Sequence, residues 1–164
     1  MRFSDLLRAT VLLSAGAATL LAVIAVIGVG RDAQPLLIAF CGVWWVLAAV
    51  TGVSLGGRSE AAIQRLLAAA RTQTSLPEVQ PGRTLLNRLW PLLISTIGAG
   101  VLGVWLPQIA AIAAGFAIVW ALAWRRQEQA VAAVEERDGV RFYVDRTPPL
   151  SPIRLVRTPG LMAG

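Results

Sequence analysis

Three carboxylates stand close together in the C-terminal quarter of the chain: Glu135, Glu136 and Asp138. Neighbouring carboxylates can act together as a general acid and a general base. Here they follow a segment with the character of a water-exposed helix, and Arg137 stands among them. We therefore interpret them as a solvated charged face and predict no catalytic residue there.

Histidine is absent from the chain, and Cys41 is its single cysteine. Without histidine the chain lacks the commonest general base and the commonest metal ligand, so Ser–His and Cys–His pairs are excluded. One cysteine inside an apolar run can form neither an intrachain disulfide nor a cysteine-based metal site. We expect a protein that is not an enzyme and that holds no cofactor and no metal.

Residues 98–103 match the dinucleotide-binding pattern G-x-G-x-x-G. That pattern needs a preceding strand and a helix N-terminus that points at phosphate, whereas here it lies inside an apolar run. Small residues at four-residue spacing instead predict close helix packing. Whether these small faces meet helices of the same chain or of another subunit stays open. The residues are Gly52, Gly56, Ser95, Ala99, Gly103, Ala111 and Gly115.

The elements that must carry these residues are four uncharged apolar runs, over residues 9–30, 36–57, 89–106 and 109–124. Hydrophobic residues make up 56% of the chain and the mean hydropathy is +0.66, both above the range of ordinary soluble domains. The first run is long enough to cross about 30 Å of hydrocarbon. We predict four transmembrane helices, with a cleaved signal peptide as the alternative for the first run. Pro107 and Gln108 alone separate the last two runs, which predicts a close antiparallel pair.

Two polar segments flank these runs. Within the loop over residues 58–88, residues 59–71 are predicted to form a short amphipathic helix, which could lie among lipid headgroups or pack under the bundle. The fourth helix is expected to continue to Asp138, with Gly139 as a left-handed cap. Residues 140–145 and 153–157 are predicted to form a β-hairpin or an extended arm. An isolated hairpin is marginal in water, so it must pack on something.

Arginine placement predicts the orientation. The N-terminus holds Arg2 and Arg8, the long loop holds five arginines, and the tail from Arg125 holds seven, whereas the two opposite connections hold only Arg31, offset by Asp32. Basic residues are enriched on the cytoplasmic side of membranes. We expect a cell-membrane protein with both termini in the cytoplasm. It would comprise a four-span domain over residues 1–126 and a cytoplasmic extension over residues 127–164.

The arginines near the expected inner surface could bind anionic lipid headgroups, at about 1 kcal/mol each, or an acidic partner, or could only set the topology. We expect no nucleic acid as a partner. Apolar residues of the C-terminal arm are predicted to contact a cytoplasmic partner surface: Phe142, Tyr143, Ile153 and Leu155. The candidate arginines are Arg58, Arg65, Arg71, Arg83, Arg88, Arg125 and Arg126.

No Asp, Glu, Lys, Arg or His residue lies within the four runs. Proton relays and ion-coupled transport use such groups, so their absence argues against a pump but leaves a passive pore made by several chains open. The hydroxyls inside the runs are expected to bond to carbonyls of the preceding helical turn. They are Ser14, Thr19, Thr51, Ser54, Ser95 and Thr96.

Three tryptophans are placed deep in the runs, and we expect them to face a neighbouring helix or lipid. They are Trp44, Trp45 and Trp120.

These observations favour an all-α membrane protein: a four-helix bundle with a cytoplasmic amphipathic helix and a short C-terminal β-hairpin or extended arm. The leading hypothesis is a non-enzymatic accessory or assembly subunit that also contacts membrane lipids. It would bind other membrane protein subunits, or itself, through small-residue helix faces and the cytoplasmic arm. A passive oligomeric channel or small transporter is the alternative. An enzyme that acts on lipid at the cytoplasmic face, with Arg65, Arg83 or Arg88 holding phosphate, ranks third.

Overall fold

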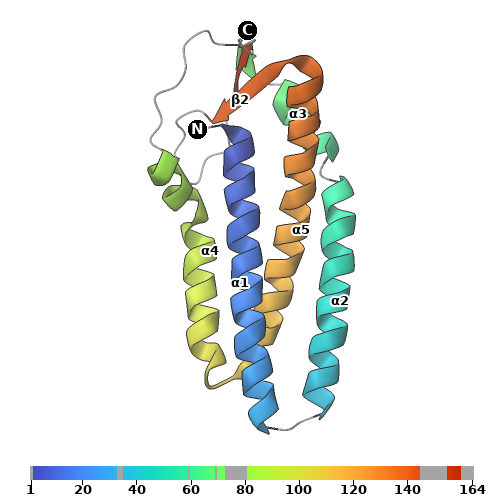
Figure 1. Cartoon of the computed structure of the whole chain (residues 1–164), viewed down its shortest axis with the longest axis vertical. Helices are drawn as coiled ribbons and strands as arrows, with labels where there is room; N and C mark the ends of the chain where they lie inside the picture. The colour runs from blue at the N-terminus through green and yellow to red at the C-terminus, as the bar shows by residue number, and fades with distance from the viewer. Residues whose placement is uncertain are drawn as a thin grey trace.

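The computed structural model describes residues 2–32, 35–58, 60–68, 70–72, 81–144 and 155–159. Its four long helices run side by side (Figure 1). Each of them is long and apolar enough to cross a membrane. This confirms the prediction of four long apolar helices and is consistent with a multi-pass membrane protein. They are α1 (Phe3–Asp32), α2 (Pro35–Arg58), α4 (Pro81–Gly103) and α5 (Pro107–Asp138).

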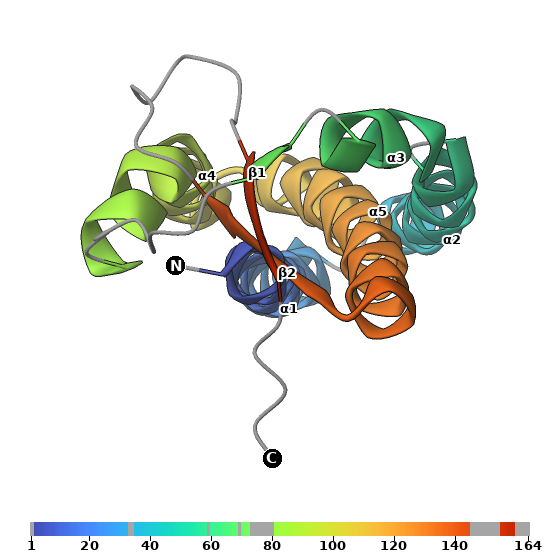
Figure 2. The same ribbon diagram turned by 90° about the horizontal axis from the view of Figure 1, so that it is seen from above.

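Helix α5 organises the bundle. It packs along α1 and α2, and α4 packs on both α1 and α5. Seen from one end, α5 lies between α1 and α2, whereas α4 lies on the side of the bundle away from α2 (Figure 2). Helix α2 contacts mainly α5, and α4 buries little of its surface. The two outer helices therefore depend on contacts with the α1–α5 pair.

Three prolines begin their helices, and Pro91 does not. Pro35 and Pro107 are the first residues of α2 and α5, where a missing N–H loses no helical hydrogen bond. Helix α4 already begins at Pro81, so the last eight residues of the segment predicted as a polar loop are helical. As a result Pro91, expected in the first turn of the third span, lies inside α4.

One end of the bundle carries a short helix and a sheet, and we call it the sheet end. Helix α3 (Glu60–Ala68) lies there with β1 (Arg71–Thr72), β2 (Val140–Val144) and β3 (Leu155–Pro159). The strand order is β1-β3-β2, in which β2 is antiparallel to β3 and β1 is parallel to β3. The antiparallel pair is the predicted C-terminal hairpin, whereas β1 was not predicted because two residues are too few to show an alternating pattern.

Gly139, in the left-handed conformation, connects the end of α5 to β2 of the sheet. Helix α5 runs beyond Trp124 to Asp138, and Gly139 follows with φ 60° and ψ 28°, as predicted for a glycine cap. The backbone N–H of Phe142 donates a 3.1 Å hydrogen bond to Oε1 of Glu135. This bond ties the first strand after the turn back to the last turns of the helix.

The sheet-end core joins parts of the chain that are distant in sequence. Residues from α1, α3, α5, β2 and β3 bury their side chains in one cluster, which we call the cap. The sheet is therefore stabilised by the bundle on which it packs, as a short hairpin requires. The cap comprises Phe3, Leu6, Leu7, Ile63, Leu67, Val131, Val140, Phe142, Val144 and Leu155.

Below the cap, small side chains let α1 and α5 approach each other closely. Ala110, Ala111 and Ala114 are completely buried in a cluster with Leu21 and Ala25. A second small cluster of alanines joins the same two helices nearer the cap. Without a hydrophobic effect between helices in lipid, such close packing is a main source of helix association.

Candidate functional site

Two of the three carboxylates considered for acid–base chemistry, Glu135 and Asp138, have structural partners. Glu135 accepts the Phe142 N–H, and Arg137 pairs with Asp138 at 2.8 Å between Nε and Oδ1 on the exposed surface. The hydrogen bond from Arg137 lowers the pKa of the Asp138 carboxyl below its ordinary value. Within the described part of the chain, no three His, Cys, Asp or Glu side chains gather into a group that could hold a metal ion.

The deep tryptophans of α2 clamp it to α5. The indole N–H of Trp44 donates to the carbonyl oxygen of Ile112 at 3.3 Å, and that of Trp45 donates to the carbonyl oxygen of Ala111 at 3.0 Å. The two acceptor carbonyls belong to successive residues of α5. In lipid, where water cannot compete inside the bundle, interhelical bonds of this kind hold helices together.

Glycines make room for this contact. The Trp44 indole occupies the space that a side chain at Gly115 would need, and a Cβ at Gly52 would lie 3.0 Å from Cβ of Leu122. A Cβ at Gly56 would lie 2.8 Å from Cδ of Arg126. These three small residues, together with the buried Ala111, therefore face helices of the same chain.

The small residues of α4 do not share one surrounding. A Cβ at Gly103 would lie 2.6 Å from Cβ of Ala110, so this glycine permits the tight connection between α4 and α5. Ala99 is half-buried against the Leu21 cluster. Ser95 is exposed and donates a 3.0 Å hydrogen bond to the carbonyl oxygen of Leu92. The predicted face thus packs inward at one end and opens into a groove at the other.

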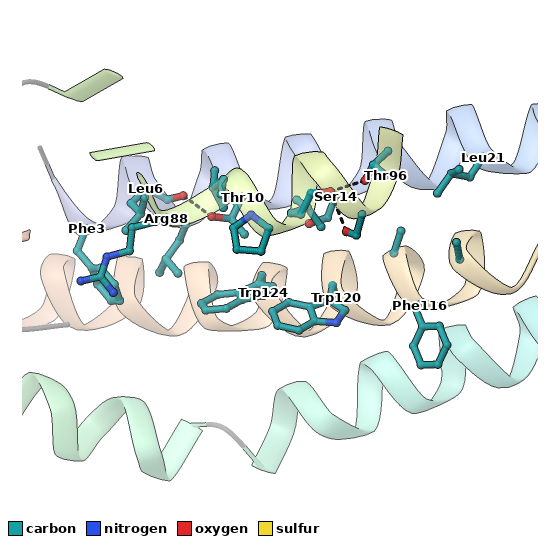
Figure 3. Close-up of a pocket in the computed structure, with 17 residues that line it drawn as sticks. Phe3, Leu6, Thr10, Ser14, Leu21, Arg88, Thr96, Phe116, Trp120 and Trp124 are labelled. Atoms are coloured by element: carbon teal, nitrogen blue, oxygen red, sulfur yellow. Dashed lines mark hydrogen bonds between the residues drawn. The ribbon is translucent and has the colours of Figure 1, made fainter. Parts of the chain in front are cut away.

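This groove, with a volume of about 660 Å³, lies between α1, α4 and α5. Helix α1 forms its floor from Phe3 to Leu21, and its rims are residues 88–96 of α4 and 113–124 of α5. In Figure 3, Arg88 lies at the end nearest Phe3, and Trp120 and Trp124 form a wall facing Thr10 and Ser14. The two indole rings stack with centroids 6.1 Å apart and an interplanar angle of 25°.

Hydroxyls in the groove bond mostly to their own helices. Thr10 donates to the carbonyl oxygen of Leu6 at 2.9 Å, and Thr96 donates to that of Leu92 at 2.7 Å. Similar bonds by Thr19, Thr51, Ser54 and Ser95 confirm the prediction for hydroxyls inside the spans. Ser14 differs, because its Oγ is buried and has no hydrogen-bond partner among the described residues. The groove is therefore apolar over most of its length.

Among the candidate arginines whose side chains the structure describes, only Arg88 lines the groove, and it is half-buried. Arg65 is exposed on α3, and Arg125 and Arg126 are exposed on α5. The side chain of Arg126 also covers Gly56. The side chains of Arg58, Arg71 and Arg83 lie outside the described part of the structure.

The C-terminal arm does not present the predicted partner contacts. Phe142 is 2% exposed and Leu155 is 4% exposed, and both lie in the cap against the chain's own helices. In this conformation the two side chains stabilise the hairpin against the bundle, and their contact with a separate partner stays a prediction. Tyr143 is half-buried and pairs with Arg2 at the start of the chain through an isolated bridge. Ile153 lies outside the described residues.

No protein-family model, no curated protein sequence and no solved structure matches this chain. The groove itself was not predicted from the sequence, since its walls come from three helices. One signal for it exists: Leu7, Thr10, Ser14 and Leu21 recur at helical spacing along α1. That stripe mixes hydroxyls with large apolar residues but does not reveal which other helices complete the wall.

Proposed function

We propose that this chain is a non-enzymatic assembly subunit of the cell membrane that binds another membrane protein, with its cap and both termini in the cytoplasm. The orientation is supported by the arginines: Arg2, Arg8, Arg88, Arg125 and Arg126 all belong to the sheet end of the helices. The opposite end holds Arg31 beside Asp32. This asymmetry is the positive-inside pattern.

The observation that carries the proposal is the folded cap. A chain that served only as an anchor would have no need to bury Phe142, Val144 and Leu155 on its own helix ends. Once ordered, the cap presents Arg65, Arg141 and Arg157 at its surface. Complementary charge on a partner would steer association and fix its register. The partner surface we expect is therefore acidic and lies next to the membrane.

In this proposal, the glycines of the small-residue faces do not bind the partner directly. Gly52, Gly56, Gly103 and Gly115 contact helices of the same chain, so they stabilise the subunit that the partner binds. Contacts with other spans are left to the exposed sides of the outer helices. Gly98 of α4 and Gly42 of α2 have open space where a side chain would be.

A passive oligomeric channel remains the second candidate, and the structure gives it less support. A water-filled pore needs polar groups along one face, but the hydroxyls of Thr19, Thr51, Ser54 and Thr96 donate to their own helices. Solute flux through purified protein in liposomes would favour this candidate.

Native mass spectrometry after purification in a mild detergent tests the assembly role. We expect a stoichiometric membrane protein partner to co-purify. The double variant Arg141→Glu/Arg157→Glu should lose this partner, whereas Arg31→Glu at the opposite end should keep it. Recovery of the wild-type chain as a monomer with lipid alone would contradict the proposal.

A further inference from the structure

At its end nearest Phe3, the groove crosses the level where charge ends on its helices. Arg88 is the last charged residue of α4, and Trp124 immediately precedes Arg125 and Arg126 on α5. On α1, the last charged residue before the uncharged stretch is Arg8. In a membrane protein this level marks the boundary between hydrocarbon and headgroups, where arginine and tryptophan are enriched. Arg88 is thus the groove's cation at headgroup depth.

The length of the rims matches one leaflet. Residues 88–96 of α4 and 113–124 of α5 correspond to about 12 Å and about 17 Å of helix. Half of the hydrocarbon core is about 15 Å thick. A partner's transmembrane helix would extend through both leaflets and would pass the connection between α4 and α5, where Gly103 and Ala110 close the gap. The rims therefore suit a ligand that belongs to one leaflet.

The lining suits a hydrocarbon chain below a single anionic group. Leu7, Leu92, Trp120 and Trp124 supply apolar walls, and the hydroxyls of Thr10 and Thr96 are taken by helix carbonyls. Among the described residues that line the groove, Arg88 is the one that carries a charge. A guanidinium carries five N–H donors in a geometry that matches phosphate oxygens.

From these observations we infer that the groove holds an acyl chain of an anionic phospholipid, with the lipid phosphate on the guanidinium of Arg88. The inference depends on the membrane location of the helices and not on the proposed assembly role. A lipid can occupy the groove whether or not a protein partner binds the cap.

The first test places the purified chain in nanodiscs of phosphatidylglycerol and phosphatidylcholine with identical acyl chains, in equal amounts, and releases it for native mass spectrometry. We expect one retained phosphatidylglycerol. Arg88→Gln should lower the ratio of retained phosphatidylglycerol to phosphatidylcholine about five-fold, whereas Arg65→Gln, which removes an exposed arginine outside the groove, should leave it unchanged. An unchanged ratio in Arg88→Gln would overturn the inference.

Two further experiments extend this test. One asks whether a free phosphate compound can replace the lipid, and the other blocks the groove with a larger side chain. Glycerol 3-phosphate added in excess should not displace the lipid; displacement would show that the phosphate group alone is bound and would overturn the acyl-chain site. Leu92→Trp should expel the lipid because the larger ring fills the groove. Ile97→Trp, on the exposed side of α4, should retain it.

A second measurement keeps the test decisive if Arg88→Gln does not fold. A photoreactive phenylalanine analogue replaces either Leu92 or Ile97 in the otherwise unchanged chain, in membranes of the same lipid mixture. We expect the anionic share of the lipid adducts to be several-fold greater at position 92 than at 97. Equal shares, or a polypeptide adduct at position 92, would overturn the inference.

Discussion

The indole of Trp44 fills the notch that Gly115 leaves in α5, and from that position it donates its N–H to the carbonyl oxygen of Ile112. A side chain at position 115 and an indole at this depth exclude each other. The pair explains why a large aromatic residue can lie deep in a span without a ligand. Together with Trp45 it fixes α2 against α5 at one register.

Gly115→Ala should therefore weaken the bundle. The added methyl group must displace the ring and stretch or break its hydrogen bond, which we expect to lower the free energy of unfolding by about 2 kcal/mol. Denaturant unfolding in detergent micelles, followed by tryptophan fluorescence, measures the change. Gly42→Ala is the matched control, because a Cβ there meets nothing within 4 Å. If both variants unfold at the same midpoint, the clamp has no energetic importance.

Ser14→Ala should have the opposite effect. The buried Oγ of Ser14 has no hydrogen-bond partner among the described residues, and a buried unsatisfied polar group destabilises a fold by about 1–3 kcal/mol. We expect alanine to raise the free energy of unfolding by about 1 kcal/mol. Thr10→Val is the control, because the Thr10 hydroxyl is bonded to Leu6 and its loss should bring no gain. A less stable Ser14→Ala protein would show that the hydroxyl has a partner.

Phe142→Ala tests whether the cap depends on the bundle. Removing a nearly fully buried phenylalanine destabilises its surroundings by about 3–5 kcal/mol, which exceeds what a short three-stranded sheet can withstand. We expect faster tryptic cleavage after Arg141 and Arg157, while the helical circular dichroism of the spans persists. The exposed change Arg65→Ala should leave the cleavage rate unchanged. Equal resistance in Phe142→Ala would mean that the sheet is held by other contacts.

The Arg137–Asp138 pair gives a pH-dependent prediction. The folded-state pKa of Asp138 lies below its ordinary value of 3.8, first because of the hydrogen bond from Arg137. The pair therefore contributes stability above the unfolded pKa, and this contribution is lost as the pH falls through the folded pKa. Because both side chains are exposed, the contribution is small. In an NMR titration, Arg137→Gln should move the Asp138 midpoint back up towards 3.8, and an unmoved midpoint would contradict the assignment.

The long helices could be predicted because lipid imposes a simple requirement. A span must satisfy its backbone hydrogen bonds internally and expose apolar side chains over its whole length, so four uncharged runs predict four helices. The end of α5 could be predicted equally well, since Gly139 is a local signal for a left-handed cap. Both features depend only on neighbouring residues.

Features that depend on distant residues could not be predicted in the same way. Pro81 begins α4 within a polar segment, and β1 forms because β3 lies beside it. The burial of Phe142 and Leu155 depends on where α1 begins and where α3 lies. The groove likewise arises from the spacing of three helices, so Arg88 stands out only once Trp120 and Trp124 are placed opposite α1.

The proposed assembly role requires that the cap lies on the cytoplasmic side of a membrane that the chain crosses four times. Site-directed labelling tests this directly: single cysteines are introduced as Arg141→Cys at the sheet end and Gln108→Cys at the opposite end, in a Cys41→Ala background. In right-side-out membrane vesicles, an impermeant maleimide should label position 108, and position 141 only after the vesicles are opened. Labelling of position 141 in sealed vesicles would contradict the proposed topology and the assembly role built on it.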